Sequence, residues 1–175
     1  NKLEALVNEH EMRGMAIYVI DHKNGEQYGH AIGMADDASQ TAMTTDTPVR
    51  IASNTKTYVA ATVLRLHEEG LLNIDHAMDR FIIDDYNQTL LGDGYQTNNI
   101  TLRHLLSHTA GFFDHAATPN YMKALADSPD HQWTRQEQIS KLVEWGDPLW
   151  ATNEKFQYSD SGYLMLGHII EQVTN

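Results

Sequence analysis

The hydrophobic pattern of the chain changes at residues 47–56, and this change most constrains the fold. Residues 47–52 are predicted to be extended, because Pro48 is incompatible with a helix interior. From Thr55 to Glu69, apolar residues recur at spacings of three and four, which predicts an amphipathic helix. Gly70 suits the position just after a helix end. The sequence thus predicts strands before this point and helices after it.

An antiparallel hairpin is predicted before the change of pattern. Met15–Ile20 has the composition of a strand, Asn24-Gly25 is a strong hairpin signal, and Tyr28–Met34 follows as the returning strand. A short helix is expected over Lys2–Met12. The only further strand we expect is an edge at Val49-Arg50-Ile51, and two strands alone rarely form a stable sheet.

Helices dominate the prediction after residue 56. Thr101 is expected to cap a helix that runs to Ser107 or His108, and Thr134-Arg135-Gln136-Glu137 is a capping box. The predicted helices after residue 70 are 77–83, 101–108, 121–125, 134–146 and 161–173. The polar segments 36–46 and 84–99 are predicted as loops.

Composition excludes several classes of protein. The chain has 175 residues and a formal net charge of −12 with no basic stripe, which does not favour binding to nucleic acid. No apolar run approaches the length of a membrane span, and no N-terminal signal segment is expected in this chain. The absence of cysteine rules out disulfides and a thiolate nucleophile.

Ser53-Asn54-Thr55-Lys56 combines a possible nucleophile with a possible base. Residues three apart on a helix share one face, so Ser53 and Lys56 meet if the helix begins at the serine. A serine hydroxyl reacts poorly until a base takes its proton. A helix N-terminus also favours a developing oxyanion. By itself the motif leaves a second interpretation open, in which Ser53 is only a helix cap.

Four segments resemble the serine β-lactamase and penicillin-binding-protein superfamily, and they occur along the chain in the same order as in that superfamily. They are similar to the S-x-x-K signature, to a G-x-A-D strand end, to an "ITLRHLLSHTSG" segment and to the Y-x-N motif with its following helix. The matching residues are 47–57, 33–36, 100–111 and 156–167. The resemblance covers nearly the whole chain and indicates the branch that contains class C β-lactamases, D-alanyl-D-alanine carboxypeptidases and related esterases.

This resemblance implies an α/β (α+β) fold of the serine β-lactamase-like type, in which an antiparallel sheet flanked by helices carries an inserted helical region. We expect residues 1–52 to form the N-terminal helix and first strands, and residues 53–175 to form the helical region with the motifs. No K-T-G or H-x-G triplet follows Tyr158. The chain is therefore expected to be an N-terminal part, truncated before the C-terminal strands of the sheet.

The resemblance also implies catalytic roles. Ser53 would attack a carbonyl carbon and become acylated, Lys56 would accept its proton or polarise the network, and Tyr158 would relay a proton to the leaving group. The plainer interpretations are a solvated surface lysine and a buried core tyrosine. Half of the oxyanion hole would be the Ser53 N–H, and the other half would come from a strand that this chain lacks. No cofactor is implied.

Asp160 departs from the family pattern, which has asparagine there. An ionised carboxylate only accepts hydrogen bonds, whereas an amide can donate to a substrate carbonyl. A negative charge near Lys56 would raise the pKa of that lysine and weaken it as a base. Asp160 is either a substrate-binding residue of the cleft or the N-cap of the next helix, and both interpretations remain open.

A metal site is the third possibility. His104 and His108 have a ligand spacing on a helix, with Asp114 and His115 nearby. No glutamate follows His104 as in H-E-x-x-H, and both histidines lie inside the segment that resembles the family. We therefore favour core and capping roles and expect no metal.

The sequence predicts a serine hydrolase that acts through an acyl-enzyme on a small ester, amide or D-amino-acid peptide. An esterase or D-peptidase is favoured over a β-lactamase because of Asp160. The alternative is a non-catalytic family member or inactive fragment that acts as a binding module. The resemblance suggests a bacterial periplasmic or secreted protein, and poor activity for these 175 residues alone.

Overall fold

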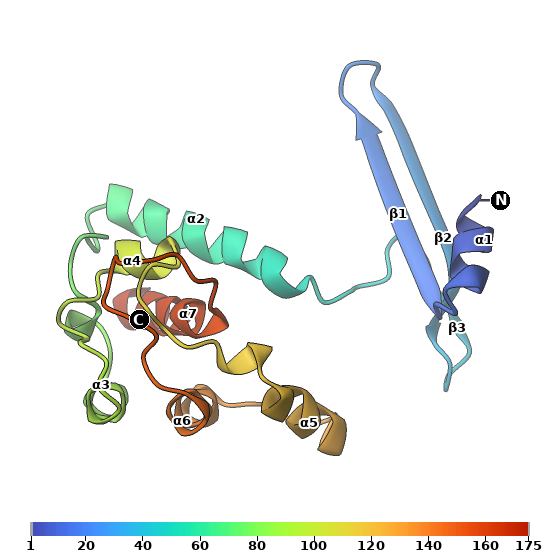
Figure 1. The fold of residues 1–175 in the computed structure, drawn as a ribbon. Helices are drawn as coiled ribbons and strands as arrows, with labels where there is room; N and C mark the ends of the chain where they lie inside the picture. The colour runs from blue at the N-terminus through green and yellow to red at the C-terminus, as the bar shows by residue number, and fades with distance from the viewer. Residues whose placement is uncertain (1, 175) are drawn as a thin grey trace. The chain divides into compact units, whose positions relative to one another are not determined.

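A hairpin with one short helix makes up the first of two compact units, residues 1–51 and 52–175. The computed structural model describes residues 2–174 (Figure 1). The strands of the first unit form one antiparallel sheet in the order β1-β2-β3. The elements of this unit are α1 (Lys2–Glu9), β1 (Gly14–Asp21), β2 (Glu26–Asp36) and β3 (Thr41–Ala42).

The predicted hairpin is confirmed, with a turn longer than the shortest type. Strands β1 and β2 pair from Gly14 with Gly33 to Asp21 with Glu26. Four residues therefore form the loop, and Gly25 has the left-handed φ of 72° that this turn requires. The N–H of Gly25 donates to the carbonyl oxygen of Asp21 at 2.8 Å, which closes the loop.

The third strand was predicted at the wrong place. Residues 49–51 form no strand, and β3 lies inside the segment 36–46 that was expected to be a loop. The carboxylate of Asp36 accepts hydrogen bonds from the N–H of Ala38 and the hydroxyl of Ser39, at 2.9 and 2.6 Å. This side chain stabilises a tight reversal, so the chain returns at once to pair with the end of β2.

The second unit is helical. Its α2 begins at Thr55 as predicted, and Gly70 follows its end with a φ of 73°. Thr101 and Thr134 form the capping boxes that begin α4 and α6. The helices are α2 (Thr55–Glu68), α3 (Asp84–Gly92), α4 (Leu102–Leu106), α5 (Pro119–Asp127), α6 (Arg135–Trp145) and α7 (Asp160–Thr174), with 3-10 turns at Ala52–Asn54, Met78–Arg80 and His115–Ala117.

One helix was missed in the prediction and one was predicted too short, while the helix expected at 77–83 is only a 3-10 turn at Met78–Arg80. Residues 84–92 form α3 rather than a loop, because two aspartates favour its positive N-terminus and Leu90 is fully buried. Helix α5 is longer than the predicted turn at 121–125. The hydroxyl of Thr118 caps it by accepting from the N–H of Tyr121 at 3.1 Å.

Helix α7 organises the core of the second unit. It packs against α2, α4 and α6, and its buried face carries Met165, Leu166 and Ile169 (Figure 1). Because Asp160 is its first residue, this packing places that carboxylate opposite the start of α2. No helix among residues 2–174 has both the length and the apolar character needed to cross a membrane.

Candidate active site

Ser53 lies in the 3-10 turn that leads into α2, two residues before the α-helix begins. The preceding residue, Ala52, has a φ of 45°. Left-handed backbone at a residue other than glycine is uncommon and often occurs at functional sites. The local structure therefore holds Ser53 at a sharp turn from the extended segment into the helix.

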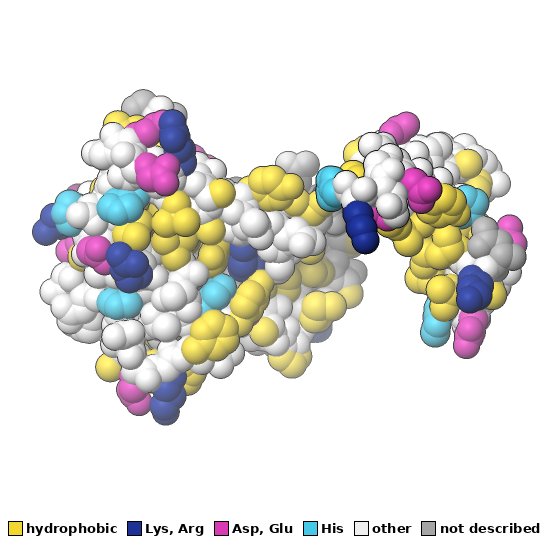
Figure 2. Space-filling view, turned by 90° about the horizontal axis from the view of Figure 1, so that it is seen from above, with side chains coloured by type: hydrophobic (Ala, Val, Ile, Leu, Met, Phe, Trp, Pro, Cys, Tyr) yellow, Lys and Arg dark blue, Asp and Glu magenta, His cyan; other side chains and the backbone are white. Residues whose placement is uncertain are grey.

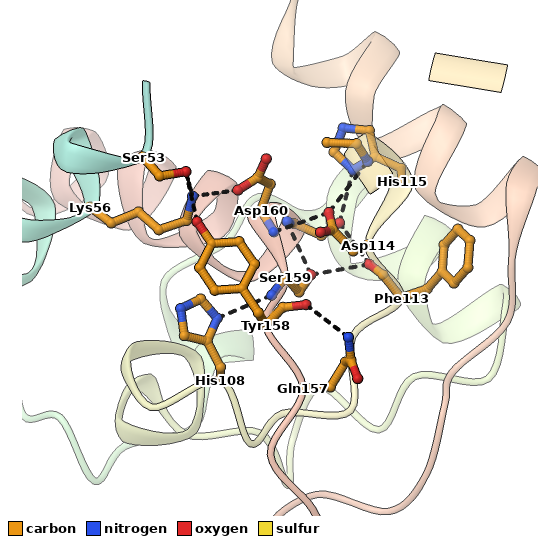
Figure 3. Close-up of polar contacts among 12 residues, drawn as sticks. Ser53, Lys56, His108, Phe113, Asp114, His115, Gln157, Tyr158, Ser159 and Asp160 are labelled. Atoms are coloured by element: carbon orange, nitrogen blue, oxygen red, sulfur yellow. Dashed lines mark hydrogen bonds and ion pairs between the residues drawn. The ribbon is translucent and has the colours of Figure 1, made fainter. Parts of the chain in front are cut away.

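Two side chains contact the hydroxyl of Ser53 (Figure 3). The phenol of Tyr158 donates to Ser53 Oγ at 2.7 Å, and Lys56 Nζ donates to the same oxygen at 3.2 Å. Lys56 Nζ also lies 4.7 Å from the centroid of the Tyr158 ring. The structure thus brings together the residues predicted as nucleophile, base and proton relay, although Tyr158 is 105 positions from Ser53 in sequence.

Lys56 also forms an ion pair with Asp160. Burial of the ammonium lowers the pKa of Lys56, but hydrogen bonds to Asp160 and Tyr158 and the charge of Asp160 raise it more. The pKa of Lys56 therefore lies above its ordinary value, and the lysine is protonated at neutral pH. As an ammonium it donates to Ser53 and cannot accept the serine proton.

Asp160 does not cap the helix that it begins. The hydroxyl of Ser159 accepts from the N–H of Ser161 at 3.2 Å, so Ser159 has the capping contact. The Asp160 carboxylate is left to contact Lys56, while its N–H donates to Asp114 Oδ1 at 3.1 Å. The interpretation of Asp160 as an N-cap is wrong, and its side chain belongs to the site.

The sequence did not indicate which residues support the segment 159–161, where α7 begins. The carbonyl oxygen of Phe113 accepts from the hydroxyls of Ser159 and Ser161, at 3.1 and 2.8 Å. Burial raises the pKa of Asp114, with the charge of Asp160 adding to that effect. These contacts join residues 46 or 48 apart in sequence, so no local pattern predicted them.

The histidines considered as metal ligands have other contacts. His104 completes the capping box, since its Nδ1 accepts from the N–H of Thr101 at 3.1 Å. His115 is buried, and its Nδ1 lies 2.9 Å from the hydroxyl of Ser161. His108 stacks on tyrosines. Within residues 2–174, no three potential ligand side chains lie close enough together to hold a metal ion.

A pocket of about 320 Å³ lies beside Ser53. Helices α2, α6 and α7 contribute its walls, which combine apolar surface with the polar groups of the site. The lining residues are Ala52, Ser53, Thr55, Lys56, Val59, Gln138, Asp160, Tyr163 and Leu164. A small substrate with both a polar and an apolar part suits this composition.

A family model described as Beta-lactamase matches residues 1–175 of this chain. The chain therefore belongs to the β-lactamase family, and it has the family's β-lactamase-like fold in part. Penicillin-binding protein 4* of Bacillus subtilis (strain 168) is 27% identical over 175 residues, which are 98% of this chain and 35% of that protein. The chain spans about a third of the length of the curated relatives it matches.

Solved structures agree with this assignment. The octameric penicillin-binding protein homologue from Pyrococcus abyssi is 26% identical with a TM-score of 0.76, over 99% of this chain and 39% of that one. EstCE1, a hydrolase with promiscuous acyltransferase activity, is also 26% identical, with a TM-score of 0.71 over 97% of this chain and 44% of that one. This chain is similar to both, and it corresponds to less than half of each.

Proposed function

We propose that the whole protein is a serine hydrolase in which Ser53 is acylated and then deacylated by water. The observation that supports this most is the convergence of Tyr158 and Lys56 on Ser53 Oγ, at 2.7 and 3.2 Å. A nucleophile within hydrogen-bond distance of two groups that can move protons is the arrangement covalent catalysis needs. Membership of the β-lactamase family supports the same chemistry.

The reaction begins with attack of Ser53 Oγ on a substrate carbonyl carbon. The serine proton passes to Lys56 when that amine is neutral, or through Tyr158, and Tyr158 delivers a proton to the leaving group. The N–H of Ser53 provides one oxyanion contact, and the second comes from chain outside these residues. For that reason residues 1–175 alone react more slowly than the whole protein.

The proposed substrates are small esters, amides or D-amino-acid peptides. Asp160 contacts Lys56 at the position where the family pattern has an amide. Because an ionised carboxylate only accepts hydrogen bonds, Asp160 cannot donate to a substrate carbonyl as that amide would. This makes an esterase or D-peptidase a better fit than an efficient β-lactamase. We further propose that the protein is exported from a bacterial cell, in keeping with the family resemblance.

The test is covalent labelling of the whole protein with a fluorophosphonate and with a penicillin. Mass spectrometry should locate the adduct on Ser53, and Ser53→Ala should abolish it. Ser39→Ala is the matched control, because Ser39 is an exposed serine of the first unit. Absence of any adduct on Ser53 overturns the proposal.

A non-catalytic binding role is the second candidate. It is favoured by one observation, the raised pKa of Lys56, because an ammonium cannot serve as a base. The labelling experiment separates the two functions. A protein that binds D-amino-acid peptides in calorimetry but never forms an adduct is a binding module.

A further inference from the structure

His108 contacts the segment that carries Tyr158 through both its ring and its backbone. It follows α4 with a left-handed φ of 56°. Its ring stacks on the Tyr158 ring, with centroids 4.5 Å apart and planes 28° apart. The His108 ring also stacks on the Tyr163 ring, with centroids 5.0 Å apart. The imidazole therefore contacts the proposed proton relay, which lies beside it in Figure 3, and also a tyrosine of α7.

The same histidine binds the backbone on each side of Tyr158. The N–H of Gln157 donates to the carbonyl oxygen of His108 at 2.9 Å. The N–H of Ser159 donates to His108 Nδ1 at 3.2 Å. One residue thus holds the preceding amide, the aromatic ring and the following amide of this segment.

We propose that His108 is a positioning residue that holds Tyr158 with its phenol against Ser53. This inference rests on the proposed function, in which Tyr158 relays a proton. Tyr158 lies in irregular structure before α7 and its side chain is 38% exposed, so the neighbouring secondary structure alone does not fix its ring. A displacement of about 1 Å between reacting groups can cost a hundredfold in rate.

The contact to Ser159 requires a neutral imidazole. Nδ1 accepts a hydrogen bond, so the proton of the neutral ring is on Nε2. Protonation would add a proton at Nδ1, which would then be unable to accept this hydrogen bond. The charged or titratable groups facing the ring are Lys56 from α2, Asp160 and Tyr163 from α7, and Asp114 and Tyr158 from the loops.

Burial lowers the pKa of His108, and the positive charge of Lys56 lowers it further against the opposing carboxylates. The positioning contact is therefore intact at neutral pH. It is lost as the pH falls through the lowered pKa of His108. The acylation rate should therefore fall at acidic pH, because protonation of the imidazole breaks its hydrogen bond to the Ser159 N–H.

A double-mutant cycle on the whole protein tests the proposal. His108→Phe keeps an aromatic ring but removes the acceptor for Ser159, and we expect it to slow fluorophosphonate labelling of Ser53 by about tenfold or more. In a Tyr158→Phe background, the same substitution should have no further effect. Equal losses in the two backgrounds, or no loss in either, overturn the proposal.

His104→Phe is the matched control. His104 also belongs to the α4 region and also accepts a backbone N–H through Nδ1, but it has no stacking contact with Tyr158. It should lower thermal stability without slowing the labelling of Ser53 in the folded protein. Equal slowing by His104→Phe and His108→Phe would mean a purely structural role and would overturn the proposal.

His108→Asn provides a rescue and a second readout if His108→Phe does not fold. Asparagine tolerates the left-handed backbone, and its amide oxygen lies near the position of Nδ1. Labelling at neutral pH should fall by no more than about threefold, and the acidic decline due to the imidazole should disappear. An unchanged acidic decline overturns the inference. A wild-type protein that never labels would instead overturn the proposed function.

Discussion

The two units bury their apolar side chains to very different extents. In the second unit Val63 and Ile169 are fully buried, as part of a core that joins α2 to α7. In the first unit Val19 and Ile20 are 49% and 47% exposed, and Val7 is its one buried hydrophobic residue among those described. Figure 2 shows hydrophobic side chains at the molecular surface.

This difference separates a unit with a buried apolar core from a unit whose apolar side chains are mostly exposed. Neighbouring residues of a strand point to opposite faces, so the exposure of Tyr18 and Val19 means that both faces of β1 are open. Strand β1 is also an edge of the described sheet. The described sheet of the first unit therefore has open faces and an open edge, while the second unit holds every residue of the candidate site.

The largest expected effect tests whether the chemistry belongs to the second unit. Lys56→Met removes the amine that hydrogen-bonds Ser53 Oγ and that can accept the serine proton in its neutral form, so acylation of the whole protein should slow by about 10³-fold. Labelling reactions quenched at successive times and analysed by mass spectrometry measure the rate of acylation of Ser53. Lys23→Met, in the loop between β1 and β2, should leave it unchanged. A similar loss of acylation rate in Lys56→Met and Lys23→Met would mean that the chemistry does not belong to the second unit alone.

The second effect measures the difference in burial directly. Ile169→Ala leaves a cavity in the second unit and should lower the free energy of unfolding by about 2–5 kcal/mol. Ile20→Ala removes the same atoms from an exposed position and should cost less than about 1 kcal/mol. Urea denaturation of the 175-residue chain provides both values. A loss for Ile20→Ala as large as that for Ile169→Ala would mean that the hairpin is buried in solution.

The third effect concerns the charge that the second unit places beside its nucleophile. Asp160→Asn removes the carboxylate that helps to raise the pKa of Lys56, so the alkaline rise in acylation rate should move to lower pH. At a fixed pH near neutrality, β-lactam acylation should therefore increase several-fold. A pH profile of penicillin labelling measures the shift. An unchanged or lower rate would contradict this role of Asp160.

The same pair gives a signed prediction for stability. The pKa of Lys56 in the folded protein is raised above its ordinary value of 10.5. The contribution of this group is therefore complete below that value and is lost as the pH rises through the higher folded pKa. Between neutral pH and pH 9 it should not change. Asp160→Asn should weaken this alkaline dependence, whereas Asp127→Asn, in an exposed ion pair with Lys123, should leave it unchanged.

Local signals in the sequence predicted much of the fold. The hairpin, the start of α2 and the capping boxes depend on turn residues, periodicity and contacts within a few positions. Helix α3 was missed because its many polar residues resemble a loop, and only the burial of Leu90 in the core reveals its role. The strand expected at 49–51 was replaced by β3 because a side-chain turn at Asp36 brought the chain back sooner.

The candidate site was predictable only as far as its motifs extend. Ser53, Lys56, Tyr158 and Asp160 were identified from spacing and family resemblance, and the structure places them together. The supporting contacts of His108 and Asp114 join segments 51 and 46 residues apart. Such contacts depend on how α4 and α7 pack, which periodicity does not determine.

The smallest effect tests how much of the second unit's stability is local. Thr134 caps α6 by accepting from the N–H of Glu137 at 3.2 Å, so Thr134→Ala should cost about 1 kcal/mol in urea denaturation. Thr134→Ser keeps the hydroxyl and should cost little, as should Thr45→Ala at an exposed position of the first unit. A cost for Thr134→Ala as large as that of Ile169→Ala would mean that α6 depends on its cap rather than on the core. In that case local capping would explain the stability of the second unit. The difference in burial between Ile169 and Ile20 would then not explain it.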